Sequence, residues 1–322
     1  MNRSLQICDT WQDLGCAQGS AVALGFFDGI HIGHQSVIRA AVECARAEGL
    51  AAGVFTFRLP LSHRLKGGRL ETEGDKRRVM EQLGVQVYLE PPFEAVRDQS
   101  PEEFVDQILV GAFRAKAVFC GDNFTFGKKA AGNVDTLRTL CAARGIRVVQ
   151  VTMALWQGQN VSSTRIRAAL EAGDVAAANA MLGRPYRIDF PVKHGQGLGH
   201  TLGFPTINQV FPEGFIQPRY GIYITRVQVD GVWYPGATGL GTRPTVNLTG
   251  KNPTCETFIP GFAGNLYGAQ PVLEFYEYLA PSRKFASVDE LRACVQDAAA
   301  KATAYFAPGG AGYAAAQPGT GV

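Results

Sequence analysis

Two histidines three residues apart, His31 and His34, stand in the turn GFFDGIHIGH (residues 25–34), together with three glycines and an aspartate. Such a turn between an apolar run and a helical pattern lets the backbone approach phosphate oxygens, and the helix start offers unpaired N–H groups to an anion. Histidines at this spacing can face one side and donate to a triphosphate, whose reactions depend on electrostatic stabilisation. A structural corner with two solvated histidines is the alternative. Because two of the five histidines fall in this turn, we favour phosphate chemistry.

A second group of residues suited to phosphate lies in VSSTRIRAAL (residues 161–170). Ser162 or Ser163 can cap a helix here, with Arg165 and Arg167 in its first turns. The guanidinium fork matches phosphate oxygens, whereas an arginine near a helix N-terminus opposes the macrodipole and needs another partner. We therefore expect a phosphate contact, with a surface arginine on a capped helix as the alternative.

A third group lies in the second half of the chain. Thr206 and Asn208 are two apart in GHTLGFPTIN (residues 199–208), so an extended chain points both side chains to one face. Their oxygens could complete the shell of Mg²⁺, which otherwise takes waters and phosphate oxygens. Glu256, an isolated acid in the sequence CETF, is a candidate general base for phosphoryl transfer to a hydroxyl. Structural Thr and Asn in a turn and an ordinary charged strand residue are the alternatives; the glycines and the acid together favour a site.

The elements that must position these residues alternate in the first 180 residues. The apolar, strand-like runs cover residues 21–27, 51–57, 85–90, 116–121 and 147–151. The helical patterns between them cover residues 35–48, 74–83, 100–113 and 133–144. In the third helix Ser100 is the expected N-cap, Pro101 the first helical residue and Glu103 the partner in a capping box. The alternation predicts a parallel α/β sheet with helices on both faces, whose ligands bind at the carboxyl ends of the strands.

The pattern changes near residues 183–186. Short β-rich pieces alternate there with Gly/Pro turns, and one amphipathic helix, SVDELRACVQDAAAKATAYF, comes last. This predicts an antiparallel β-barrel or sandwich with a closing helix. We expect domains at 1–184 and 185–306, followed by a disordered Gly/Ala/Pro-rich tail at 307–322.

Composition narrows the class of protein. Hydrophobic residues make up 46% and charged residues 18% of the 322 positions, as in globular proteins. The net charge of +3 comes with no basic block, which gives no reason to expect nucleic acid or an anionic membrane surface as partner. No apolar run has the length of a membrane span or of a signal peptide core. Seven scattered cysteines without a CxxC pattern favour reduced thiols in a cytoplasmic protein over a disulfide framework or a zinc site.

The motifs together resemble a known family. GFFDGIHIGH is similar to the signature of the flavin-adenylylating branch of the HxGH nucleotidyltransferases, which have a Rossmann-like domain. The other segments that resemble this branch are GDNFTFGKKAAGN (121–133) and VSSTRIRAAL. The segments that resemble the riboflavin kinase module, in its order, are HGQGLGHTLGFPTIN (194–208), YGIY (220–223), GTRPTVN (241–247) and CETFIPGFAGNLYG (255–268). The whole chain except the tail therefore resembles the bacterial bifunctional riboflavin kinase/FMN adenylyltransferases.

The resemblance implies roles for individual residues. In the first half, those implied to bind ATP and FMN are Gly25, Phe27, Asp28, Gly29, His31, Gly33, His34, Gly121, Asp122, Asn123, Phe124, Ser163, Thr164 and Arg167. In the second half, those implied to bind Mg·ATP and riboflavin are Gly195, Gly197, Gly199, Pro205, Thr206 and Asn208, with Glu256 as the base. Phe124 and Phe126 could pack on a flavin ring or on the core, and core aromatics are the more common case.

Three positions depart from the family pattern. Arg58 replaces an aspartate in TFRLPLSH, where a histidine comes only at His63. His200 and Ala280 each replace an arginine. Loss of one of the two activities is therefore an alternative to our main prediction.

The main prediction is a two-step enzyme that uses Mg·ATP to convert riboflavin to FMN, and FMN to FAD with release of pyrophosphate. A non-catalytic flavin-binding or regulatory protein is a third hypothesis, against which the presence of the base and the metal ligands argues. A fourth, adenylylation of a pantetheine or nicotinamide nucleotide, does not account for the kinase-like half.

Overall fold

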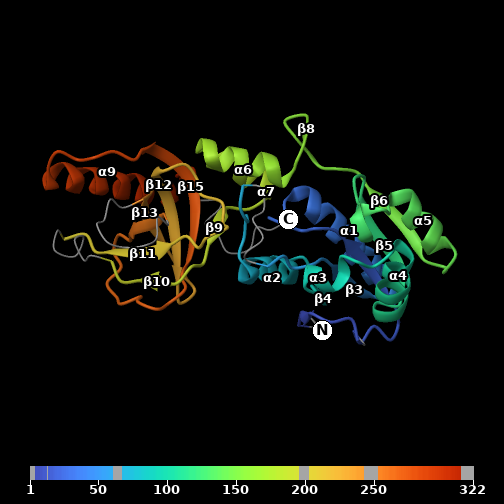
Figure 1. Ribbon diagram of the computed structural model, residues 1–322. Coiled ribbons are helices and arrows are strands. Elements are labelled where there is room, and N and C mark those ends of the chain that lie inside the picture. Colours follow the sequence, from blue (N-terminus) through green and yellow to red (C-terminus); the bar gives the residue numbers. More distant parts are fainter. Residues whose placement is uncertain (1–3, 13, 61–66, 196–202, 243–252, 313–322) are drawn as a thin grey trace. The chain divides into compact units, whose positions relative to one another are not determined.

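Two β-sheets organise the chain (Figure 1), for which the computed structural model describes residues 4–12, 14–60, 67–195, 203–242 and 253–312. Residues 1–63 and 73–162 form one unit, and residues 64–72 and 163–322 form the other. We call them the N-terminal and the C-terminal unit. Within the described residues, no helix combines the length and apolar character needed to cross a bilayer.

The N-terminal unit contains a parallel sheet of six strands in the order β1-β4-β3-β2-β5-β6. Its strands are β1 (Gln6–Cys8), β2 (Ser20–Leu24), β3 (Ala51–Phe55), β4 (Val87–Leu89), β5 (Ala115–Gly121) and β6 (Arg147–Val151). The five predicted strands are confirmed. The edge strand β1 was missed because three residues are too few to show a period of two.

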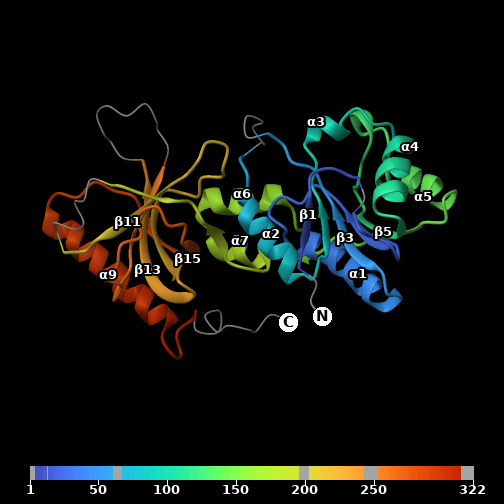
Figure 2. The same ribbon diagram turned by 90° about the horizontal axis from the view of Figure 1, so that it is seen from below.

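Helices cover both faces of this sheet, as predicted (Figure 2). They are α1 (Ile32–Glu48), α2 (Glu73–Gln82), α3 (Phe93–Val96), α4 (Pro101–Glu103), the π-helix η1 (Phe104–Ala112), the 3₁₀ turn η2 (Lys128–Ala130) and α5 (Val134–Ala142). Along β2, Ala21 and Ala23 pack in the core with α1 and α2, whereas Val22 and Leu24 pack with η1 and α5. The period of two in β2 thus supplies both cores.

The strand order contains a switch point between β2 and β5. The chain runs from β2 through β3 to β4 on one side of β2, and then places β5 and β6 on its other side. In open parallel sheets, ligands bind outside the carboxyl ends of the strands at such a point. The turn with His31 follows β2 and the loop beginning at Asp122 follows β5, so the two predicted motifs share this edge.

The C-terminal unit is built on an antiparallel sheet in the order β10-β11-β14-β13-β12-β15-β9. The strands are β9 (Tyr186–Ile188), β10 (Val192–Lys193), β11 (Thr206–Val210), β12 (Gly221–Val229), β13 (Val232–Gly241), β14 (Thr254–Phe258) and β15 (Val272–Pro281). The sheet curls into a half-barrel, and α9 (Val288–Phe306) closes it by packing Ala298 and Ala299 against Ala237 of β13. The predicted fold class, a Rossmann-like α/β domain followed by an antiparallel barrel with a closing helix, is confirmed.

The remaining elements lie between the two sheets in sequence. They are the hairpin β7 (Leu155–Trp156) and β8 (Gln159–Asn160), and the helices α6 (Ser163–Ala172) and α7 (Val175–Leu182). The C-terminal unit includes α6, α7 and the segment 64–72. In that segment, the backbone N–H of Arg69 donates to the carbonyl of Gly214, and the carbonyl of Arg69 accepts from the N–H of Ile216. The predicted boundary at 184/185 refers to the two catalytic modules rather than to these units, and it stays a prediction.

The expected tail is described only in part. Residues 307–312 form turns in which the N–H groups of Gly310 and Gly312 donate to the carbonyls of Ala307 and Tyr305. Residues 313–322, the rest of that prediction, lie outside the described residues.

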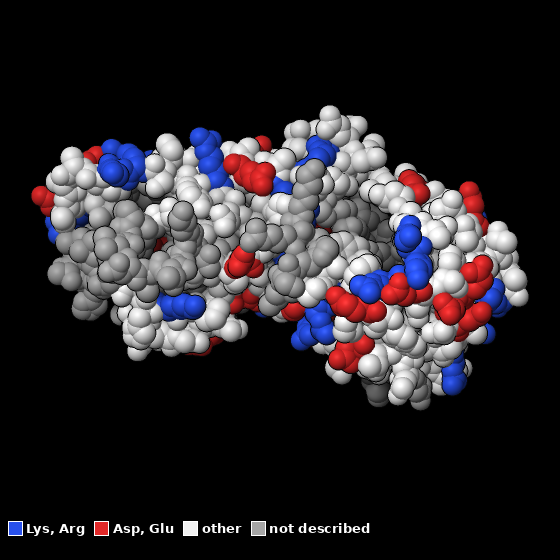
Figure 3. All heavy atoms as spheres, in the orientation of Figure 1, with Lys and Arg blue, Asp and Glu red and all other residues white. Residues whose placement is uncertain are grey.

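Acidic and basic side chains both occupy the molecular face shown in Figure 3. Lys and Arg alternate there with Asp and Glu rather than forming a field of one sign. This mixture agrees with the small net charge of +3.

The predicted capping box is present and gives a stability test. Ser100 Oγ accepts from Glu103 N–H at 3.1 Å, and Glu103 Oε2 accepts from Ser100 N–H at 2.7 Å. We expect Ser100→Ala to lower the free energy of unfolding by about 1 kcal/mol, because the first turn loses an acceptor. Urea unfolding followed by circular dichroism measures this loss. Glu81→Ala, at an exposed helical position, is the control, and equal stability of the two variants would contradict the capping role.

Candidate active sites

His31 is the N-cap of α1. Its backbone is extended (φ −69°, ψ 172°), and its Nδ1 accepts a hydrogen bond from His34 N–H at 3.2 Å. The helix therefore begins at Ile32, three residues earlier than the predicted start at 35. The prediction was wrong there because imidazole does the work of the usual Ser, Thr, Asp or Asn cap.

This cap determines which nitrogen of His31 can donate. Nδ1 carries no proton while it accepts from His34 N–H, so the neutral ring carries its proton on Nε2. The ring is 3% exposed and stacks on His34 with the centroids 3.6 Å apart and the planes at 17°. The Phe27 ring lies 5.2 Å from that of His34, edge to face. Packing thus fixes both imidazoles beside the first turn of α1.

Two glycines make this arrangement possible. Gly29 has φ 85°, a left-handed conformation that favours glycine. A Cβ on Gly33 would lie 3.2 Å from Nδ1 of His31, so a side chain there would press on the capping ring. Asp28, directly before Gly29 in the turn, is buried. The sequence motif is therefore one packed unit, and its residues are brought together as predicted.

The loop after β5 supplies the second part of this edge. The side-chain amide of Gln150 donates to Asp122 Oδ1 at 2.7 Å, and the rings of Phe124 and Phe126 stack at 5.7 Å. Phe126 is 7% exposed and packs against Phe104. Phe126 therefore belongs to the core, which leaves Phe124, partly buried, as the aromatic candidate for ligand contact.

The predicted phosphate-binding residues of α6 belong to the C-terminal unit. Ser163 and Thr164 begin α6, and buried Arg167 donates through Nε to the carbonyl of Gly68 at 2.6 Å. A cation near a helix N-terminus is disfavoured by the helix dipole, and the carbonyl of Gly68 offsets part of this cost for Arg167. The place of these residues relative to His31 stays a prediction.

Two of the three departures from the family pattern lie in the described residues. Ala280 is on β15, where it pairs with Ile222 of β12. Arg58 follows β3, where its backbone N–H donates to Pro91 and its carbonyl accepts from Phe93. The backbone at this position is therefore paired with the segment after β4. His63 and His200 lie outside the described residues.

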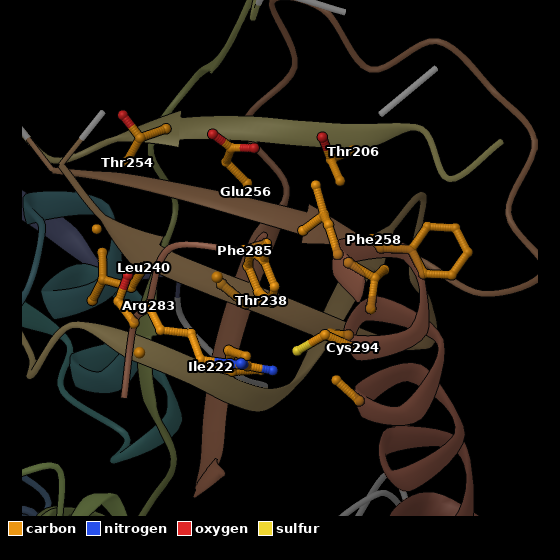
Figure 4. A pocket seen from close by; sticks show the side chains of 18 of the residues that line it. Thr206, Ile222, Thr238, Leu240, Thr254, Glu256, Phe258, Arg283, Phe285 and Cys294 are labelled. Atoms are coloured by element: carbon orange, nitrogen blue, oxygen red, sulfur yellow. The ribbon is translucent and has the colours of Figure 1, made fainter. Parts of the chain in front are cut away.

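The C-terminal unit contains a pocket of about 440 Å³ between its sheet and α9 (Figure 4). Thr254, Glu256 and Phe258 alternate along β14 and line it, together with Thr206 of β11. Leu291, Cys294, Val295 and Ala298 line it from one face of α9. The strand period of two and the helical spacing of three and four explain why these residues face one space.

Strand register brings the predicted metal ligands and base together. Asn208 of β11 pairs directly with Glu256 of β14, and Thr206 pairs with Phe258. Opposite residues in an antiparallel pair share a face, with Cβ atoms about 5 Å apart. Thr206 and Asn208 therefore lie on one face, as their spacing predicted, and the register adds Glu256 to that face.

The side chain of Asn208 packs closely against the backbone of Gly195. It is 6% exposed, and a Cβ on Gly195 would come within 2.5 Å of its Nδ2. Gly195 thus has a packing role beside a predicted ligand, and Pro205 precedes Thr206 at an exposed position. Gly197 and Gly199 lie outside the described residues.

The oxygen donors of Thr206 and Asn208 fit a magnesium ion carried on nucleotide phosphates. Both are neutral, and such an ion takes most of its ligands from phosphates and water. Within the described part of the chain, no group of three His, Cys, Asp or Glu side chains forms a metal site of its own. Two neutral donors leave most positions around such an ion to phosphate and water oxygens.

Several pocket residues were missed in the sequence. They include Ile222, Phe258, Arg283, Phe285 and the α9 residues. The helical spacing of residues 291, 294, 295 and 298 was a usable signal. Arg283 had none, because a residue in a loop after a strand has no period that fixes its direction.

Two family profiles match this chain. The FAD synthetase profile covers residues 14–165, and the riboflavin kinase profile covers residues 182–306. A bifunctional riboflavin kinase/FMN adenylyltransferase from Bacillus subtilis is 35% identical over 295 residues, 89% of this chain and 92% of the relative. The protein with that description from Listeria monocytogenes is 32% identical over 308 residues, 93% and 95% of the two chains.

A crystal structure of a macrolide-efflux protein from Streptococcus pneumoniae is similar in fold. Its TM-score is 0.80 at 26% sequence identity, over 93% of this chain and 98% of that one. The likeness therefore extends over both sheets, and efflux is a description of that protein only.

The two units and their profiles define a transferase with an adenylyltransferase module and a kinase module. The chain belongs to the family of bifunctional riboflavin kinase/FMN adenylyltransferases.

The contact between Gly33 and His31 provides a test of the first site. We expect Gly33→Ala to displace the His31 ring and to reduce FAD formation from FMN by about tenfold or more, a barrier change of ~1.4 kcal/mol. Thermal stability should change little, because the higher helix propensity of alanine offsets a weakened His31 cap. FMN formation from riboflavin by the same preparation is the control. Unchanged FAD formation would contradict the role of the His31 position.

Proposed function

We propose that the chain makes FMN at the pocket of the C-terminal unit and FAD at the β2–β5 edge of the N-terminal unit. Family membership establishes the two activities, riboflavin kinase and FMN adenylyltransferase. The proposal assigns them to these sites. The observation that carries it is the pairing of Asn208 with Glu256 beside a pocket of about 440 Å³, large enough for a flat heterocycle.

In the kinase step, Glu256 accepts the proton of the terminal ribityl hydroxyl. That oxygen then forms a bond to the γ-phosphorus of ATP as the bond to the β–γ bridging oxygen breaks, so FMN and ADP result. Mg²⁺ on the ATP, held through Thr206 and Asn208, would neutralise phosphate charge. The apolar residues of the pocket surround the ring system and keep water from it.

In the adenylyltransferase step, the FMN phosphate attacks the α-phosphorus of ATP and pyrophosphate leaves. Nε2–H of His31 and the N–H groups at the start of α1 donate to phosphate oxygens that gain charge. Asp122, Asn123 and Phe124 belong to the neighbouring loop after β5, at the edge where we place the flavin and adenine. Ser163, Thr164 and Arg167 are proposed to complete the phosphate contacts.

The module boundaries 1–184 and 185–306 form part of this proposal, supported by profile matches at 14–165 and 182–306. We also propose a cytoplasmic location. It is supported by the seven cysteines, all of which are free thiols.

Selective loss of one step tests the assignment of the sites. We expect Glu256→Gln to abolish FMN formation from riboflavin, because the amide cannot take the hydroxyl proton, and to leave conversion of FMN to FAD intact. His31→Ala should have the converse effect. Chromatography of flavins from separate reactions measures both steps. Glu277→Gln, at an exposed position on β15, is the matched control. Loss of both steps in either variant would contradict two independent sites.

A further inference from the structure

The pocket of the C-terminal unit has an asymmetric charge distribution. Among the described residues that line it, Glu256 and Arg283 carry the only formal charges. In Figure 4, Glu256 and Thr206 lie at one side of the pocket, and Arg283 lies at the other side near Ile222. A ligand that fills the space therefore meets an acid at one side and a guanidinium at the other.

The Arg283 guanidinium contacts the first turn of α9 and the ring of Phe285. Its Nη1 donates to Glu290 Oε1 at 2.5 Å, and its central carbon lies 5.0 Å from the centroid of the Phe285 ring. Glu290 Oε2 accepts from Ala286 N–H at 2.7 Å, so one carboxylate binds both the arginine and the loop backbone. The Ala286 N–H first, and then Arg283, hold the pKa of Glu290 below its usual range, so the carboxylate stays charged at neutral pH.

Part of this guanidinium remains available to a ligand. Within the described residues, Nε and Nη2 of Arg283 have no hydrogen-bond partner, while Nη1 is engaged with Glu290. Phe285 lines the pocket beside them. The arginine thus presents fixed donors next to an aromatic wall, a combination that suits a flat heterocycle with carbonyl oxygens on its edge.

The isoalloxazine ring of a flavin has this chemistry. One end of the ring is a dimethylbenzene, and the other is a pyrimidine with two carbonyl oxygens. Apolar side chains such as Leu240, Phe258 and Val295 also line the pocket. The ribityl chain leaves the central ring and has to reach Glu256 in the kinase step.

We propose that Arg283 binds the carbonyl edge of the isoalloxazine ring and thereby anchors riboflavin in the pocket on the side opposite Glu256. The inference rests on the proposed kinase function of this pocket. Arg283 is in this view a specificity-determining residue, and Glu290 is a positioning residue that holds it.

Kinetics of the full-length protein test the inference. We expect Arg283→Ala to raise KM for riboflavin by about tenfold, the loss of a charged hydrogen bond, with kcat and KM for ATP changed by less than about twofold. The inhibition constant of lumiflavin, which has the ring and lacks the ribityl chain, should rise by the same factor. Arg283→Gln, a second variant of similar length, should also raise KM for riboflavin. Lys284→Ala is the control, because Lys284 is exposed and does not line the pocket.

Three results would overturn the inference. The first is an unchanged KM for riboflavin in Arg283→Ala and Arg283→Gln. The second is a raised KM for riboflavin with an unchanged lumiflavin constant, which would place the arginine on the ribityl chain or on a phosphate. The third is a raised KM for ATP alone. Failure of the wild-type protein to phosphorylate riboflavin would contradict the proposed function itself, so the two failures are distinguishable.

Discussion

Backbone hydrogen bonding between neighbouring strands is the constraint on which both sites depend. The parallel pairing of β2 with β5 brings the turn around His31 and the loop from Asp122 to the same edge of one sheet. The antiparallel pairing of β11 with β14 places Asn208 opposite Glu256 in the other. A shift of one residue in the second pairing would turn every side chain to the opposite face and separate base from metal ligands.

In each site, hydrogen bonds between neighbouring residues also orient a side chain that can contact the substrate. In the first, His31 Nδ1 accepts from His34 N–H and so caps α1, which places the proton of the neutral ring on Nε2. In the second, Glu290 fixes Arg283 and the loop that precedes α9. Both sets of hydrogen bonds orient donor groups before a substrate binds, which reduces the reorganisation that binding requires.

Much of this architecture could be predicted from the sequence, because strand and helix periods are local properties. The five predicted strands of the parallel sheet and the capping box at Ser100 are examples. The start of α1 was placed too late, because histidine is not a usual cap. Arg283 was missed, because only the fold brings the loop after β15 to the pocket between the sheet and α9. The assignment of Phe126 to the core likewise depended on its contact with Phe104, far from it in sequence.

The central claim is that one chain carries both working sites. The most direct measurement incubates the purified protein with ATP and Mg²⁺, starting from riboflavin in one reaction and from FMN in a second, and separates FMN and FAD by chromatography. We expect FAD in both reactions. FMN as the sole product from riboflavin, with no product from FMN, would contradict the claim and leave a kinase with an inactive N-terminal unit.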